Sequence, residues 1–174
     1  MPDTSSYCHL TNIMRHFLVI LPTAIWLAGC ALLGTDDGPP DLSLEELGAA
    51  PSLVTIDGKV LSLETYMWRD FMPMAPPAGR ALVAILRVRT DDGSAIPDGL
   101  RMPAAWIVND RQVWGTFLED EQPEPHPDDA LELVARNGPK WGPHIEVDVV
   151  VRIQESNGAL HLLRAAGQPI DRTD

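Results

Sequence analysis

The chain has 174 residues, of which 13 are Lys or Arg and 25 are Asp or Glu, so its formal net charge is −12. So acidic a surface repels a phosphate backbone, which argues against nucleic acid as a partner. Hydrophobic residues make up 45% of the chain, and this share and length are typical of one globular domain rather than of a fibrous or fully disordered chain.

A basic start, an apolar run and a cysteine follow one another between residues 14 and 30. Arg15 precedes the apolar residues 17–26, and the run ends in Leu27-Ala28-Gly29-Cys30. This run is too short to cross a bilayer core of about 30 Å as a helix, but it suits the hydrophobic region of a signal peptide. Small residues before the cysteine suit a cleavage site, so we expect the chain to be exported.

The tetrapeptide resembles the lipobox of bacterial lipoproteins. The resemblance implies that Cys30 is lipidated, with acyl chains such as palmitate, and becomes the mature N-terminus after residues 1–29 are removed. It implies a lipid-anchored protein of the cell envelope, on the periplasmic face of the outer membrane in a cell with two membranes, because Ala31 rather than Asp follows the cysteine. An uncleaved membrane helix and an ordinary buried cysteine are the alternatives, and translation can start at Met1 or Met14.

Residues 30–51 are predicted to form a flexible tether after the lipidated cysteine. Gly, Pro and Asp are frequent there, and no apolar periodicity is present. Within the tether, residues 42–48 predict one helical turn, since Ser43 and Glu46 have the spacing of a capping box.

Residues 52–174 are predicted to form the folded domain, because the hydrophobic period there is two. In residues 144–154 five apolar residues alternate with polar ones, and only Val150 interrupts the polar face. Turn signals such as Asp57-Gly58 and Asn109-Asp110 separate further strands. The expected strands are residues 53–56, 59–63, 82–90, 103–108, 112–118, 131–136, 144–154 and 159–166.

Seven to nine short strands without a long helical pattern favour an all-β fold, in the form of an antiparallel β-sandwich. At the level of architecture the domain resembles immunoglobulin-like and fibronectin-III-like sandwiches, although it lacks the paired cysteines of true immunoglobulin domains. A small β-barrel is the alternative.

The segment of residues 66–74 is the richest in aromatic and methionine side chains. Trp68, Phe71 and Met72 are candidates for a patch that binds a partner, with packing in the core or at a sheet edge as the alternative. Thioether sulfurs also bind Cu(I), but in an extended strand Met67 faces away from Met72 and Met74. We therefore expect no metal site there.

Trp141 is a further candidate for partner binding, because it is central to a rigid loop of Gly and Pro in residues 137–143. It either presents its ring to a partner or folds back onto the domain. His144 and His161 can face each other across the last hairpin, and His126 lies among acidic residues and prolines. Neither arrangement offers a convincing zinc ligand set, so we expect no metal and no cofactor.

No motif in the chain carries a recognisable catalytic chemistry. None of the five serines after residue 30 lies in a nucleophile elbow, and the chain lacks a phosphate-binding loop and a dinucleotide fingerprint. We expect a non-catalytic binding or assembly module that contacts an envelope protein. The alternatives are a periplasmic protein that binds a metal or small ligand, and a hydrolase.

Overall fold

The computed structural model describes residues 38–121 and 128–174, all of which belong to one unit. Cys30 and His126 lie outside these residues. No helix in the described ranges is long and apolar enough to cross a membrane. The elements of the described residues are α1 (Leu44–Ala49), β1 (Val54–Ile56), β2 (Lys59–Asp70), β3 (Leu82–Thr90), β4 (Arg101–Asn109), β5 (Gln112–Phe117), β6 (Ala130–Gly138), β7 (Glu146–Gln154) and β8 (Leu160–Thr173).

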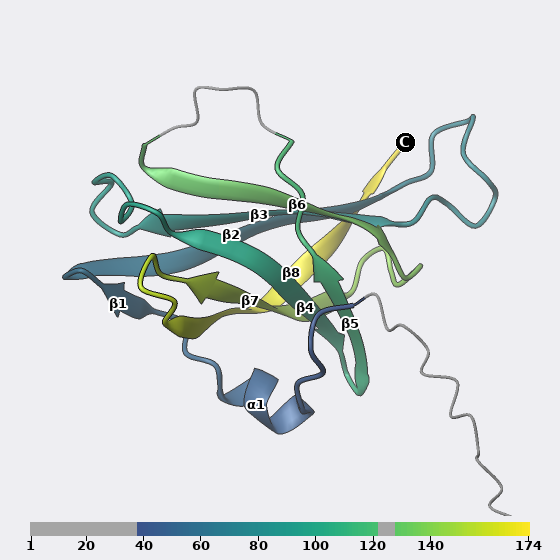
Figure 1. Ribbon diagram of the computed structural model, residues 1–174. Coiled ribbons are helices and arrows are strands. Elements are labelled where there is room, and N and C mark those ends of the chain that lie inside the picture. Colours follow the sequence, from purple (N-terminus) through teal and green to yellow (C-terminus); the bar gives the residue numbers. More distant parts are fainter. Residues whose placement is uncertain (1–37, 122–127) are drawn as a thin grey trace, which may run out of the picture. The chain divides into compact units, whose positions relative to one another are not determined.

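The strands join into one curled sheet in the order β5-β4-β7-β8-β2-β3-β6, and β1 pairs with β2 (Figure 1). This confirms the all-β fold class. The hairpins at Asp57-Gly58 and at Asn109-Asp110 form as predicted, with Asp57 and Asp110 in the left-handed region at φ 49° and 54°. Strand β3 has the bounds that the sequence predicts.

Four strands are longer than predicted, β2 and β8 by the most and β4 and β6 by a few residues, and one strand pair departs from the antiparallel arrangement. Strand β2 continues to Asp70, and β8 continues to Thr173. The first part of β8 pairs antiparallel with β7, whereas residues 170–173 pair in parallel with residues 67–70 of β2. The strand pairs β2–β8 and β7–β8 thus connect the two halves of the sheet.

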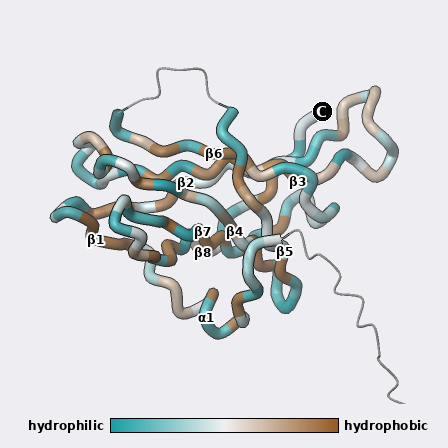
Figure 2. Tube along the Cα trace, viewed as in Figure 1, coloured by the Kyte–Doolittle hydropathy of each residue, from teal (hydrophilic) through white to brown (hydrophobic). Residues whose placement is uncertain are grey.

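The main core lies on the concave side of the curled sheet. Alternate residues of β3 and β7 point into it, including Leu86, Val149 and Ile153, each with none of its surface exposed. The other face of these strands carries most of the polar residues, so that hydrophilic and hydrophobic positions alternate along the strands in Figure 2.

Helix α1 covers a second, smaller apolar cluster on the other side of β4 and β7. Ser43 caps the helix, with its hydroxyl accepting from the N–H of Glu46 and the Glu46 carboxylate accepting from the N–H of Ser43, which confirms the capping box. Leu47, 1% exposed, packs with Trp106 and Val150. This cover explains why an apolar residue interrupts the polar face of β7.

The helix also corrects the predicted extent of the tether. Arg164 of β8 donates to the Gly48 carbonyl at 2.9 Å, and its own N–H donates to the Pro51 carbonyl at 2.8 Å. Residues 43–51 are therefore part of the folded domain rather than a free linker. The sequence predicts a helical turn there, but it does not reveal which face of the sheet the turn packs against.

The two ends of the strand order, β5 and β6, approach each other. Just beyond β5, Glu119 and Val134 of β6 exchange two backbone hydrogen bonds, at 2.9 and 2.8 Å. The ring of Trp114 lies over Gly138, where an added Cβ would come within 2.5 Å of it. A larger residue at 138 would therefore require the Trp114 ring to move.

Candidate binding surface at the end of strand β2

An uncharged loop follows β2 and projects from the sheet (Figures 1 and 2). We call residues 71–79, Phe-Met-Pro-Met-Ala-Pro-Pro-Ala-Gly, the apolar loop. Met72 is 51% exposed and Met74 is 89% exposed. Large apolar side chains rarely stand so far out of a domain without a binding role when they are contiguous.

Arg69 fixes the base of the apolar loop from inside the domain. Its guanidinium donates to the carbonyl of Ala78, to that of Arg80 at 3.0 Å, and to those of Lys140 and Gly142 at 3.1 and 2.8 Å. The side chain is 3% exposed, and this burial lowers the pKa of Arg69 from its ordinary value. An arginine remains charged in a protein, so these carbonyl dipoles stabilise its charge.

Asp70 and Phe71 complete the base. The Asp70 carboxylate accepts from the Met72 N–H at 2.8 Å and forms an ion pair with Arg80 at 3.1 Å. The guanidinium carbons of Arg69 and Arg172 lie 4.9 and 4.2 Å from the centre of the Phe71 ring. The loop therefore leaves the sheet from a tightly held origin.

The four predicted partner-binding residues differ in accessibility. Met72 is exposed, Trp68 is half-buried, and Phe71 is half-buried beneath the two arginines. Trp141 is half-buried and packs against the main core, which is the folded-back alternative. Trp68, Phe71 and Met72 thus lie along one strand and its loop, whereas Trp141 serves the core.

Tyr66 belongs to this surface, although the sequence analysis did not single it out. It is 50% exposed, and its ring stacks on Trp68 at 5.2 Å between centroids and 28° between planes. The sequence feature that could have identified Tyr66 is its position two residues before Trp68. Residues two positions apart in a strand lie on the same face, here the outer face of β2.

A polar row lies beside the two aromatic rings on the outer face of the sheet. Glu64, Arg87 and Glu132 are cross-strand neighbours on β2, β3 and β6, and Arg87 donates to the Glu132 carboxylate at 2.7 Å. Together with Tyr66 and Ile85 they line a shallow pocket of about 310 Å³. The outer face therefore offers aromatic and charged contacts side by side.

The methionine and histidine candidates for metal binding are not brought together. Met67 is 1% exposed in the core, whereas Met72 and Met74 are exposed in the loop beyond the end of β2 at Asp70, so the expected extended strand does not reach them. The register of the last hairpin does not allow His144 and His161 to face each other. His161 pairs with Ile153, whereas the His144 N–H donates to the carbonyl of Ile170, nine positions further along β8. In the described ranges, no three His, Cys, Asp or Glu residues are placed to hold a metal ion.

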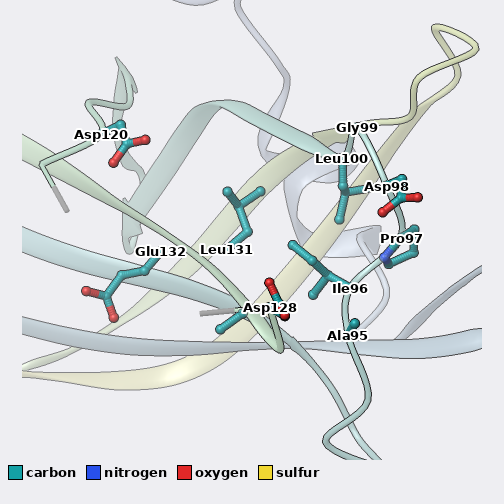
Figure 3. Close-up of a pocket in the computed structure, with 11 residues that line it drawn as sticks. Ala95, Ile96, Pro97, Asp98, Gly99, Leu100, Asp120, Asp128, Leu131 and Glu132 are labelled. Atoms are coloured by element: carbon teal, nitrogen blue, oxygen red, sulfur yellow. The ribbon is translucent and has the colours of Figure 1, made fainter. Parts of the chain in front are cut away.

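A larger pocket of about 470 Å³ lies between residues 95–100 and the start of β6 (Figure 3). Four acidic residues line it, but their carboxylates point in different directions rather than toward one centre. Glu132 turns to Arg87 instead. Among the described residues that line this pocket, no nucleophile is paired with a base and no set of carboxylates converges on a cation. The acidic residues are Asp98, Asp120, Asp128 and Glu132.

Comparisons with protein-family models, with curated proteins and with solved structures found no match for this chain.

Proposed function

We propose that this protein is a lipid-anchored lipoprotein of the bacterial cell envelope, with Cys30 as its acylated N-terminus. The observation that carries the proposal is the order of a basic start, an apolar run and Leu27-Ala28-Gly29-Cys30 in the sequence. Because Ala31 follows the cysteine, the proposed site in a cell with two membranes is the periplasmic face of the outer membrane. Three acyl chains give permanent anchoring where one chain gives marginal binding.

The domain is proposed to be a non-catalytic module that binds an envelope protein through the outer face of β2. Support comes from the stacked rings of Tyr66 and Trp68, which offer a rigid aromatic contact beside the polar row of Glu64 and Arg87. Aromatic and arginine side chains dominate the energetics of protein interfaces. No metal or cofactor has a part in this proposal.

We also propose that the sheet closes into a partial barrel, the alternative weighed beside the sandwich. The backbone bonds between Glu119 and Val134 and the packing of Trp114 on Gly138 support this reading, because both join the two ends of the strand order. A sandwich would leave those edges apart.

Mass spectrometry of the protein from membranes tests the anchor. We expect a mature chain that begins at an acylated Cys30, and we expect Cys30→Ser to abolish both acylation and cleavage before residue 30. Cys8→Ser is the matched control, because position 8 lies in the proposed leader and the mature product should not change. An unmodified Cys30 still joined to Gly29 in the wild-type protein would contradict the proposal.

A further inference from the structure

We infer that the apolar loop inserts its tip into the boundary between headgroups and acyl chains of a lipid bilayer, giving the domain a second membrane contact besides its anchor. The inference rests on the proposed function, since the anchor brings the bilayer close. Beyond the anchor, it specifies which part of the domain contacts the lipid and therefore how the domain is oriented on the membrane.

The side chains of the loop suit this boundary. Nine consecutive residues carry no charge in a chain whose net charge is −12, and Met74 among them is 89% exposed. Methionine is apolar and flexible, so it adapts to disordered lipid chains. Transfer of Met72 and Met74 from water to lipid removes exposed apolar surface without burying a charge.

The backbone of the loop is also prepared for a less polar environment, where an unsatisfied N–H is costly. Three of the nine residues are prolines, which have no N–H. Of the six remaining N–H groups, four already donate within the domain. Their acceptors are Thr173 O for Phe71, Asp70 Oδ1 for Met72, Met72 O for Ala75 and Pro76 O for Gly79.

A fixed origin lowers the cost of ordering the loop on a surface. Arg69 holds the carbonyl of Ala78, and Gly79 fits beneath Phe71 with φ +70°, where an added Cβ would lie 2.6 Å from the ring. The loop therefore leaves the domain from a held base before it meets lipid. Such preorganisation strengthens binding by reducing lost conformational freedom.

The described chain begins close in sequence to the proposed anchor. Eight residue steps separate Cys30 from Gly38, the first described residue. Pro39 lies against Gly115, and the adjacent Trp114 covers Gly138. Two residues further on, the carbonyl of Lys140 accepts from Arg69 at the base of the loop. The start of the described chain is thus linked to the loop by a short series of contacts.

A bilayer fits this loop better than a protein pocket does. The projecting tip has neither charged groups nor side-chain hydrogen-bonding groups, which a specific protein interface uses for orientation. A protein partner is better served by the aromatic and charged outer face of β2. Because the domain is acidic, the contact with lipid should be apolar, and uncharged phosphatidylcholine should suffice.

Oxidation of methionine by hydrogen peroxide tests the inference on the full protein in phosphatidylcholine vesicles. The reference is a methionine introduced by Leu160→Met at the opposite end of β8, where Leu160 is 57% exposed. Exposure alone predicts that Met74, at 89%, oxidises at least as fast as this reference. We expect Met74 on vesicles to oxidise about fivefold more slowly, since access controls the reaction. Buried Met67 and Met102 report that the fold stays intact.

A charged residue at the tip should remove the protection of the loop methionines from oxidation on vesicles. With Met74→Glu, we expect Met72 to become accessible to peroxide on vesicles, whereas Leu160→Glu should leave Met72 protected. The inference is overturned if Met74 oxidises as fast as the reference on floating vesicles. It is also overturned if protection occurs in native membranes but not in vesicles of purified protein and lipid, because a protein then covers the loop. Failure of the chain to float with vesicles contradicts the lipid anchor instead.

Discussion

At the scale of single residues, Arg69 is the side chain on which the candidate surface depends. Its guanidinium donates to backbone carbonyls, and its acceptors come from both the apolar loop and the turn after β6. A guanidinium has five N–H donors in a fixed plane, and a lysine ammonium has three on a flexible stem. No other side chain type can reach several diverging carbonyls at once in this way.

We expect Arg69→Lys to lower the free energy of unfolding by about 3 kcal/mol, because several buried carbonyls lose a charged donor. Chemical denaturation followed by tryptophan fluorescence measures the loss. Arg87→Lys is the control, since Arg87 lies on the neighbouring strand but its side chain is 48% exposed, and its ion pairs contribute less than about 1 kcal/mol. Equal losses in the two variants would show that Arg69 does not hold the loop.

The properties of single residues could be predicted from the sequence where neighbouring residues in the chain determine them. The capping box of Ser43 and Glu46 was predicted from their spacing, and the hydrogen bonds between them confirm it. The role of Arg69 could not be predicted, because two of its acceptors lie 71 and 73 positions further along the chain. Only the folded arrangement brings those carbonyls to one guanidinium.

At the scale of elements, formation of α1 makes residues 43–51 part of the folded domain, although their sequence resembles a polar linker. A six-residue helix is unstable by itself in water, so its stability comes from the capping box and from tertiary packing. The hydrogen bonds with Ser43 lower the pKa of Glu46. The capping contribution is therefore present at neutral pH and is lost as the pH falls through that lowered pKa.

We expect Leu47→Ala to destabilise the domain by about 3 kcal/mol, since it leaves a cavity between α1, Trp106 and Val150. Thermal unfolding and the fluorescence of the domain give the readout. Leu44→Ala makes the same change in the same helix at a 41% exposed site, so its effect should stay within about 0.5 kcal/mol. If both variants unfold alike, residues 43–51 do not pack on the sheet in solution and the tether prediction regains support.

Elements were predictable where period and turn chemistry agreed. Strand β3 and the hairpins around Asp57-Gly58 and Asn109-Asp110 follow from alternation between strong turn residues. The register of the last hairpin was not predictable in detail. The irregularity between Val147 and Val149, with Gly167 at φ +64° opposite, shifts the pairing, and the length of β8 is set by its second partner β2.

At the scale of the whole molecule, the sequence indicated the class of fold but not the order of its strands. Alternation establishes that a strand has one buried face, whereas it carries no information on which distant strand lies next to it. The parallel pairing of residues 67–70 with residues 170–173 joins segments about 100 positions apart. The backbone bridge between Glu119 and Val134 likewise depends on the curl of the entire sheet.

Closure of the sheet can be tested at Glu119, whose N–H donates to the Val134 carbonyl and whose carbonyl accepts from the Val134 N–H. Glu119→Pro removes the donor, whereas Glu119→Ala removes the side chain and keeps the donor. In a partial barrel we expect the proline variant to lose about 1–3 kcal/mol of unfolding free energy and to exchange the Val134 amide hydrogen faster than the alanine variant does. Two separated sandwich edges would make the proline and alanine variants alike, because in that architecture no bond joins β6 to the chain after β5.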